Sequence, residues 1–234
     1  MRPTAGPDER QGLVVMISGR GSNLLALAEA CRSGRIPARI DAVICDRPGA
    51  AGLERAAELG LDRVLIDRQR HASRADFEDS LGAALDGLAP RYIILAGFMR
   101  VLSADFVDAR PGRMINIHPS LLPRHRGLET HRRALEAGDR EHGASVHFVT
   151  PALDGGPVIS QARLDIRPGD TPDTLADRLL PLEHQLLVRT TALLMTRTVE
   201  LRDGCIHVDN QALEHPLDLD LDLAESGQRR AGAV

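Results

Sequence analysis

The sequence of 234 residues predicts an α/β fold, with a mostly parallel sheet, helices on both faces and antiparallel additions in the C-terminal half. Between Leu13 and Ile117, short β-branched apolar runs alternate with amphipathic helical patterns at the spacing of crossover connections. After Pro123 the pattern changes to neighbouring strand-like runs joined by turn-rich segments. The first pattern is typical of a Rossmann-like sheet, and the second indicates antiparallel strand pairs.

The elements of the parallel part are separated by glycine, proline and capping signals. We predict its strands at residues 13–17, 39–45, 63–66, 92–95 and 114–118. We predict intervening helices at residues 24–31 and 52–59. A third helix is predicted to open with a capping box at residues 73–76, and a short fourth helix to begin at Ser103.

The C-terminal half is predicted to hold a helix over residues 130–137 and two strands over 144–149 and 158–164. Thr171 and Pro172 open a long helix that we expect to bend at Pro181, and residues 199–208 form a hairpin around Asp-Gly. We expect one domain over residues 12–210, with flexible extensions at 1–11 and 211–234. The alternating Leu-Asp stretch in the tail is either disordered or docked at a sheet edge.

Composition narrows the class of protein. Apolar residues make up 43% and charged residues 26% of the chain, no apolar run approaches bilayer length, and no secretory signal opens it. The three cysteines form no CxxC pair and no disulfide framework, so we expect reduced thiols, no metal site and a cytoplasmic location.

Charge and residue usage exclude several activities. With a net charge of −4 and only 2% aromatic residues, the chain offers no basic or stacking face for nucleic acid. All 29 basic residues are arginine, which excludes a Schiff-base lysine and the Walker-A lysine. The partners expected are therefore small-molecule substrates. The protein itself is expected to be a monomer or a homodimer.

Asn116 and His118 are polar residues in an otherwise apolar strand that Pro119 ends. Residues two apart on a strand point to the same face, and ligands bind at the carboxyl ends of strands in open α/β sheets. A capping Asn and a core His are the more ordinary interpretations of each residue alone. Together, an amide donor and a near-neutral base at this place favour a reaction centre.

A glycine turn, Ser-Gly-Arg-Gly-Ser-Asn at residues 18–23, joins the first strand to the first helix. Backbone N–H groups and the positive end of a helix suit a phosphate there. The third glycine of the dinucleotide fingerprint would fall at Leu24, so a monophosphate suits the turn better than NAD. A plain tight turn explains Gly-x-Gly nearly as well.

Asp154 lies in a Leu-Asp-Gly-Gly-Pro loop that permits close approach to a ligand. A carboxylate beside His118 would favour the imidazolium and prepare it for acid/base chemistry, while Asn116 would stabilise a carbonyl oxygen that gains charge. No Gly-x-Ser-x-Gly elbow supplies a nucleophile, so a substrate amine would have to attack. Taken alone, Asp154 would cap its own turn equally well.

Six stretches closely resemble the folate-dependent formyltransferases, in the family's order. They are Ile17–Asn23, Ala51–Ala56, Leu95–Arg100, Asn116–Pro123, His142–Val149 and Leu153–Val158. The resemblance extends from Leu13 into the 200s and is strongest to the phosphoribosylglycinamide formyltransferases. Asn-x-His with a later Asp also occurs in formyltetrahydrofolate hydrolases.

The resemblance implies a formyltransferase fold and transfer of the formyl group of 10-formyltetrahydrofolate, a co-substrate, to the amine of phosphoribosylglycinamide in purine (IMP) synthesis. It implies that His118 transfers the proton, Asn116 polarises the formyl group and Asp154 keeps His118 protonated. The implied substrate-binding residues are Gly21, Ser22, Asn23 and Glu183. The implied folate-binding residues are Arg74, Met99, Arg100, Val101, Leu102 and Asn116.

Other interpretations stay open at this point. Residues 99–102 would also suit a strand-to-helix turn, and Arg74 a solvated helix residue. A formyltetrahydrofolate hydrolase is the next candidate, although the dozen residues before the first strand leave no room for the regulatory domain usual in those enzymes. A non-catalytic module that binds a phosphate ligand is the third. Three positions depart from the family pattern: Asp46, Arg126 and Leu180. The property that these departures would affect is the affinity for phosphate.

Overall fold

The computed structural model describes residues 10–220, and an eight-stranded sheet of order β11-β7-β6-β5-β4-β1-β2-β3 forms its centre. Its strands are β1 (Gln11–Ile17), β2 (Ala38–Cys45), β3 (Arg63–Leu65), β4 (Tyr92–Leu95), β5 (Met114–His118), β6 (Glu141–Phe148), β7 (Val158–Asp165) and β11 (Leu217–Asp218). The five neighbouring strands β5, β4, β1, β2 and β3 run parallel to one another. Strand β6 is antiparallel to both of its neighbours, β5 and β7. The predicted mixed sheet is confirmed.

Strand β1 shows why both faces of the sheet carry helices. Leu13, Val15 and Ile17 belong to one buried cluster, and Val14 and Met16 belong to a second one, all at 0% exposure. A strand that alternates between two apolar clusters needs cover on both sides. This explains the continuous apolar run in the sequence.

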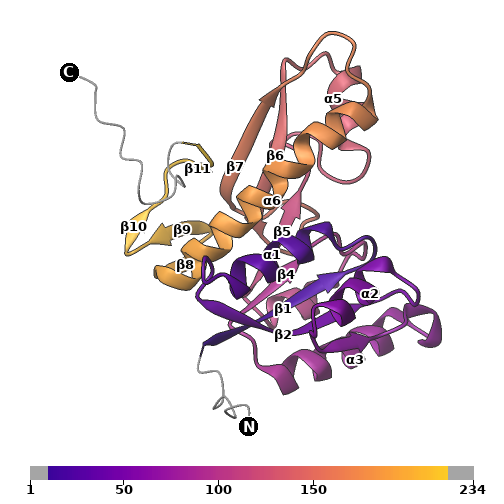
Figure 1. Cartoon of the computed structure of the whole chain (residues 1–234). Coiled ribbons are helices and arrows are strands. Elements are labelled where there is room, and N and C mark those ends of the chain that lie inside the picture. The colour runs from indigo at the N-terminus through magenta and orange to yellow at the C-terminus, as the bar shows by residue number, and fades with distance from the viewer. Residues whose placement is uncertain (1–9, 221–234) are drawn as a thin grey trace.

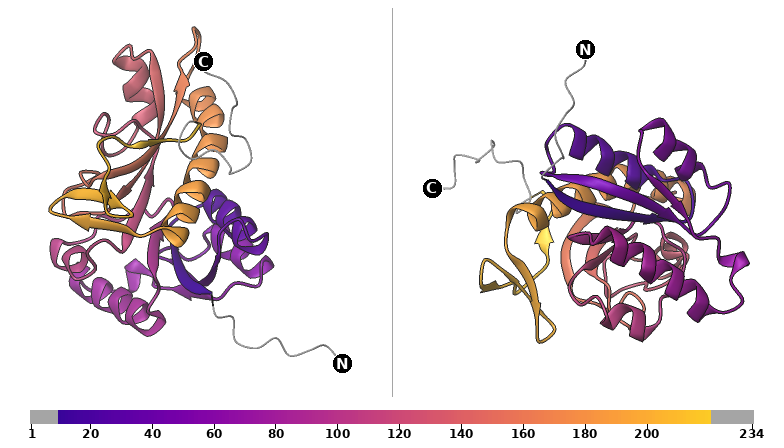
Figure 2. Two further views of the ribbon diagram at one scale, coloured as in Figure 1. Left: turned by 90° about the vertical axis from the view of Figure 1, so that its left-hand side faces the viewer. Right: turned by 90° about the horizontal axis from the view of Figure 1, so that it is seen from below.

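Helices pack on both faces (Figures 1 and 2). The first cluster includes residues of α1 (Ser22–Arg32), α2 (Ala51–Glu58) and α6 (Pro172–Thr196), and the second includes residues of α3 (Arg74–Leu88) and α4 (Ala104–Asp108). Helix α6 contacts α1 and the strands β6 and β7, and so joins the N-terminal and C-terminal halves. The short α5 (Thr130–Glu136) contacts α6, and a 3-10 turn covers Arg68–Arg70.

Helix starts follow the predicted capping chemistry. Ser73 and Asp76 form a reciprocal capping box at α3, Thr171 caps α6, and Ser103 caps α4. Helix α1 begins at Ser22, two residues before the predicted start, because the turn itself supplies its first residues.

The C-terminal part extends past the boundary expected at residue 210. Strands β8 (Val199–Arg202), β9 (Cys205–Val208) and β10 (Gln211–Ala212) form a small antiparallel sheet, and the predicted hairpin around Asp203 is present. Strand β11 pairs with β7, and Leu219 beside it is only 1% exposed. Edge docking therefore holds for this part of the tail, because the buried Leu219 and the half-buried Leu217 anchor it in the apolar core. The rest of the two expected extensions, residues 1–9 and 221–234, lies outside the described residues.

Candidate active site

The site begins at the carboxyl end of β5, between β4 and β6. Asn116 is half-buried and His118 is 6% exposed, and both point to the same face of the strand. The chain leaves the sheet directly afterwards at Pro119, as the sequence predicted.

Asp154 reaches this place from the loop between β6 and β7. Its backbone is left-handed, with φ of 46°, and its Oδ2 accepts a 2.8 Å hydrogen bond from the Gly127 N–H. The same oxygen lies 3.5 Å from Nδ1 of His118. The predicted approach of the carboxylate to the imidazole is confirmed, while the chemical roles of the two groups stay predictions.

The His118 ring has a partner on each nitrogen. Nε2 lies 3.1 Å from the backbone carbonyl oxygen of His125, which can only accept, so Nε2 carries a hydrogen and donates it. Nδ1, the other ring nitrogen, faces the Asp154 carboxylate. This arrangement suits a group that takes up a proton and returns it.

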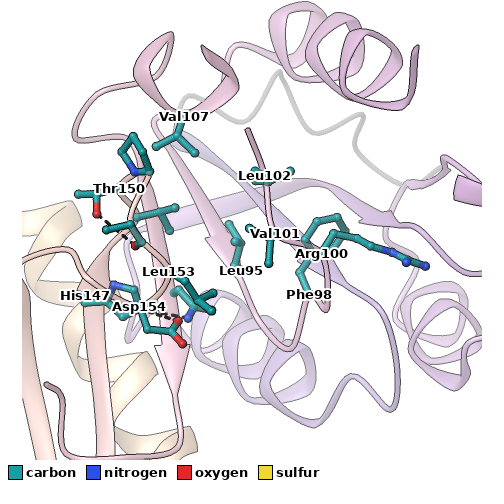
Figure 3. A pocket seen from close by; sticks show the side chains of 14 residues that line it. Leu95, Phe98, Arg100, Val101, Leu102, Val107, His147, Thr150, Leu153 and Asp154 are labelled. Carbon is teal, nitrogen blue, oxygen red and sulfur yellow. Dashed lines mark hydrogen bonds and ion pairs between the residues drawn. The ribbon is translucent and has the colours of Figure 1, made fainter. Parts of the chain in front are cut away.

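A pocket opens beside these residues, and together with the open solvent space at its mouth it measures about 510 Å³ (Figure 3). Its walls are mostly apolar and come from Leu95, Phe98, Val101, Leu102, Val107, Val149, Pro151, Ala152 and Leu153. Polar groups of the lining come from Asn116, His147 and Asp154. His118 does not line the pocket itself but lies directly behind Asp154. An apolar slot with a few convergent polar groups is typical of small-molecule sites.

The loop after β4 forms the opposite wall of the pocket. Ser18 accepts a 2.8 Å hydrogen bond from the Met99 N–H, so this loop is tied to the glycine turn. Val101 and Leu102 line the pocket, while the side chains of Met99 and Val101 remain 62% and 58% exposed at its rim. Large apolar side chains left in water at a pocket mouth provide a surface for an apolar ligand.

Arg100 also lines the pocket, but its guanidinium points away from His147 and Asp154 (Figure 3). Its Nε donates a 2.6 Å hydrogen bond to Asp46, whose side chain is 1% exposed. Asp46, one of the departures from the family pattern, is therefore paired with a cation of the loop after β4. Of the other two departures, Arg126 is exposed and Leu180 is half-buried.

The glycine turn has the geometry of an anion site. Gly21 is left-handed, with φ of 73°, and a Cβ there would lie 2.8 Å from the Cα of Gly52, so only glycine fits without strain. No side chain caps the N-terminus of α1, and no acidic residue lies in its first turn. The N–H groups at residues 22–24 thus start the helix without side-chain partners, as a phosphate would need.

Glu183 on α6 faces this turn. Burial raises the pKa of its carboxyl to about 7, against the opposing effect of a hydrogen bond with the Asn23 side chain. The structure thus joins the four expected substrate residues, Gly21, Ser22, Asn23 and Glu183, in one place. A carboxyl group that is half-protonated near neutral pH can both donate and accept hydrogen bonds there.

Arg74 lies apart from the other expected folate residues. Its side chain lines a separate open groove between α3 and α4, and its Nε donates a 2.8 Å hydrogen bond to Glu78. Glu78 in turn accepts a hydrogen bond from the Ser103 N–H, next to Leu102 of the pocket. Arg74 thus lies outside the pocket and is linked to its wall only through Glu78 and Ser103.

His147 also lines the pocket, although no role for it could be predicted from its place in the sequence. It stands opposite Asn116 in the β5–β6 ladder, and its Nε2 lies 3.1 Å from Nδ2 of Asn116. The alternation of side chains along a strand does not by itself decide which face of the sheet His147 occupies. Only the pairing register, which the sequence does not contain, brings it to Asn116.

Among residues 10–220, no group of three or more His, Cys, Asp or Glu side chains is arranged to hold a metal ion. Within the same range, no helix has the length and apolar content needed to cross a bilayer.

Comparisons with known proteins agree with this geometry. A model of the formyl transferase family matches residues 11–191. Phosphoribosylglycinamide formyltransferase of Escherichia coli K12 is 42% identical over 201 residues, which cover 86% of this chain and 95% of that protein.

Solved structures agree as well. The structure of phosphoribosylglycinamide formyltransferase from Coxiella burnetii superposes with a TM-score of 0.86 at 44% identity, over 90% of this chain and 99% of that one. A formyltetrahydrofolate deformylase from Pseudomonas putida KT2440 gives a TM-score of 0.77 at 25% identity, over 87% of this chain and 72% of that one. This chain belongs to the formyl transferase family of enzymes.

Proposed function

We propose that this enzyme transfers the formyl group of 10-formyltetrahydrofolate to the amine of phosphoribosylglycinamide, a step of purine synthesis in the cytoplasm. The observation that carries the proposal is the meeting of Asn116, His118 and Asp154 at the end of β5, between an apolar pocket and an anion-binding turn. The relatives of Escherichia coli and Coxiella burnetii, which this chain matches over 95% and 99% of their length, are phosphoribosylglycinamide formyltransferases.

The reaction needs one group that handles protons. The substrate amine attacks the formyl carbon, the carbon–nitrogen bond to the folate breaks, the amine loses a proton and the leaving nitrogen gains one. His118 changes its protonation at Nδ1 beside Asp154, so it serves both proton transfers.

The reaction also needs a donor for developing charge. As the amine attacks, the formyl oxygen gains negative charge, and an N–H of Asn116 at the pocket wall stabilises it. No side chain has to form a covalent bond to the formyl group in this mechanism, which is consistent with the lack of a nucleophile motif in the sequence.

The two binding places fit the two substrates. The apolar walls of the pocket accept the flat ring system of a folate, with Arg100, Val101 and Leu102 along one side and the exposed Met99 next to them in the chain. Arg74, in the groove between α3 and α4, would meet a part of the folate that extends beyond the pocket. The turn at Gly21, Ser22 and Asn23 takes the phosphate, and Glu183 takes hydroxyl groups of the adjoining ribose. The amine is then held next to Asn116 and His118.

The test is a product assay with the purified chain, 10-formyltetrahydrofolate and phosphoribosylglycinamide. We expect tetrahydrofolate and formylated nucleotide in equal amounts, and no folate turnover without the amine. Turnover of the folate at the same rate without the nucleotide would instead support a formyltetrahydrofolate hydrolase, the activity named for the Pseudomonas putida structure. Binding of the nucleotide with no turnover at all would leave a binding module.

A further inference from the structure

His147 is a buried histidine that the proposed mechanism does not use. It is 2% exposed, and its Nδ1 lies 2.8 Å from the backbone carbonyl oxygen of Phe148. A carbonyl oxygen can only accept, so Nδ1 carries a hydrogen and donates it. Burial lowers the pKa of His147, against smaller opposing effects from this hydrogen bond and from Asp154, and keeps the ring neutral. Its Nε2 therefore has a lone pair.

That lone pair faces the amide of Asn116. The Nε2 of His147 lies 3.1 Å from the Nδ2 of Asn116, whereas the nearest oxygen of Asp154, Oδ1, is 3.7 Å away, beyond hydrogen-bond reach. Because Nε2 is an acceptor, it must receive an N–H of the amide and would repel the amide oxygen. The contact therefore decides which end of the Asn116 side chain lies on this side of the pocket.

The contact also fixes the second amide hydrogen. An amide group is planar, so once one hydrogen points to His147, the other has a single remaining direction in the same plane. His147 and Asp154 lie together at one end of the pocket (Figure 3), and Asn116, in contact with His147, lines the pocket as well. The second hydrogen is thus left for a ligand in that pocket.

We propose that His147 is a positioning residue for formyl transfer, whose Nε2 holds the Asn116 amide so that its second N–H meets the formyl oxygen. This inference rests on the proposed function. Without the acceptor at His147, Asn116 is free to turn its own oxygen toward the formyl oxygen, which repels the developing negative charge. Removing one oxyanion donor costs about 10²- to 10³-fold in turnover, so partial loss of its orientation should cost about 10- to 100-fold.

Two substitutions separate positioning from packing. His147→Gln places an amide oxygen near the position of Nε2 and keeps an acceptor, whereas His147→Phe keeps a flat ring without one. In His147→Phe we expect kcat to fall about 10- to 100-fold, while both KM values stay within about twofold of those of the natural enzyme. In His147→Gln we expect kcat to stay within about threefold of that of the natural enzyme. Equal losses of kcat in both variants would overturn the proposal.

A double-mutant cycle gives a second test, which does not depend on how well either variant packs. If His147 acts only through Asn116, His147→Phe should change kcat by less than about twofold in the Asn116→Ala background. The same 10- to 100-fold loss in both backgrounds would contradict it.

A third measurement separates this inference from the proposed function. In the free protein, ¹⁵N NMR of the histidine rings should show His147 as the neutral form with the hydrogen on Nδ1. Hydrogen on Nε2 would overturn the positioning role even if the enzyme transfers formyl groups. The expected form together with no formyl transfer would instead remove the proposed function and, with it, the reaction that His147 is proposed to serve.

Discussion

Glu183 offers a quantitative test of the substrate-binding half of the site. Its carboxyl is half-buried on α6, beside Asn23 at the start of α1, and burial raises its pKa to about 7 from 4.5. Replacement by Gln keeps the shape and a hydrogen bond to Asn23 while removing the ionisation.

The magnitude follows from the difference between the folded and unfolded proton affinities. Each tenfold change in proton binding is worth about 1.4 kcal/mol, so a pKa raised from 4.5 to about 7 costs the folded state up to about 3 kcal/mol once the group is ionised. The raised pKa leaves stability intact below pH 4.5 and reduces it as the pH rises through 7. A carboxyl kept at this cost is expected where a ligand needs it.

The assay is urea unfolding of the natural chain and of Glu183→Gln between pH 4.5 and 8. We expect the free energy of unfolding of the variant, relative to the natural chain, to increase by up to about 3 kcal/mol over this range. Glu54→Gln, at an exposed position on α2, is the matched control and should change the free energy of unfolding by less than about 1 kcal/mol over this range. A constant difference for Glu183→Gln as well would show that Glu183 is not buried in this way.

Three further substitutions test other parts of the site. Gly21→Ala should lower the free energy of unfolding by about 1–3 kcal/mol and raise KM for the nucleotide, because φ is 73° and the new Cβ meets Gly52. Thermal unfolding and steady-state rates measure the two effects, and unchanged values would contradict the prediction. Asp154→Asn should lower kcat by about 10²-fold or more with little change in stability, since an amide oxygen still accepts from Gly127; a kcat near that of the natural enzyme would remove Asp154 from the mechanism. Asp46→Asn weakens the ion pair with the partly exposed Arg100 and should raise KM for the formyl folate about two- to fivefold, with the KM for the nucleotide as the internal control.

Much of the fold could be predicted because local and long-range signals agree. The alternation of apolar residues in β1, the capping box at Ser73 and the Asp-Gly turn of the C-terminal hairpin each depend on neighbouring residues only. The pair Asn116 and His118 was found for the same reason, since two positions on one strand share a face whatever the rest of the chain does.

The rest of the site depends on contacts between distant segments. Asp154 meets His118 only because β6 and β7 pair beside β5, and His147 meets Asn116 only through the register of that ladder. A shift of one residue would turn His147 to the other face. The docking of Leu217–Asp218 on β7 is of the same kind, because an alternating charged stretch is compatible with an edge strand and with disorder alike.

We propose that His118 carries out the proton transfers and that neither substrate depends on it for binding. The most direct measurement is single-turnover formyl transfer by His118→Ala, with the dissociation constants of both substrates determined separately. We expect both constants within about threefold of the natural values and a transfer rate at least about 100-fold lower. A transfer rate close to that of the natural enzyme would contradict the claim.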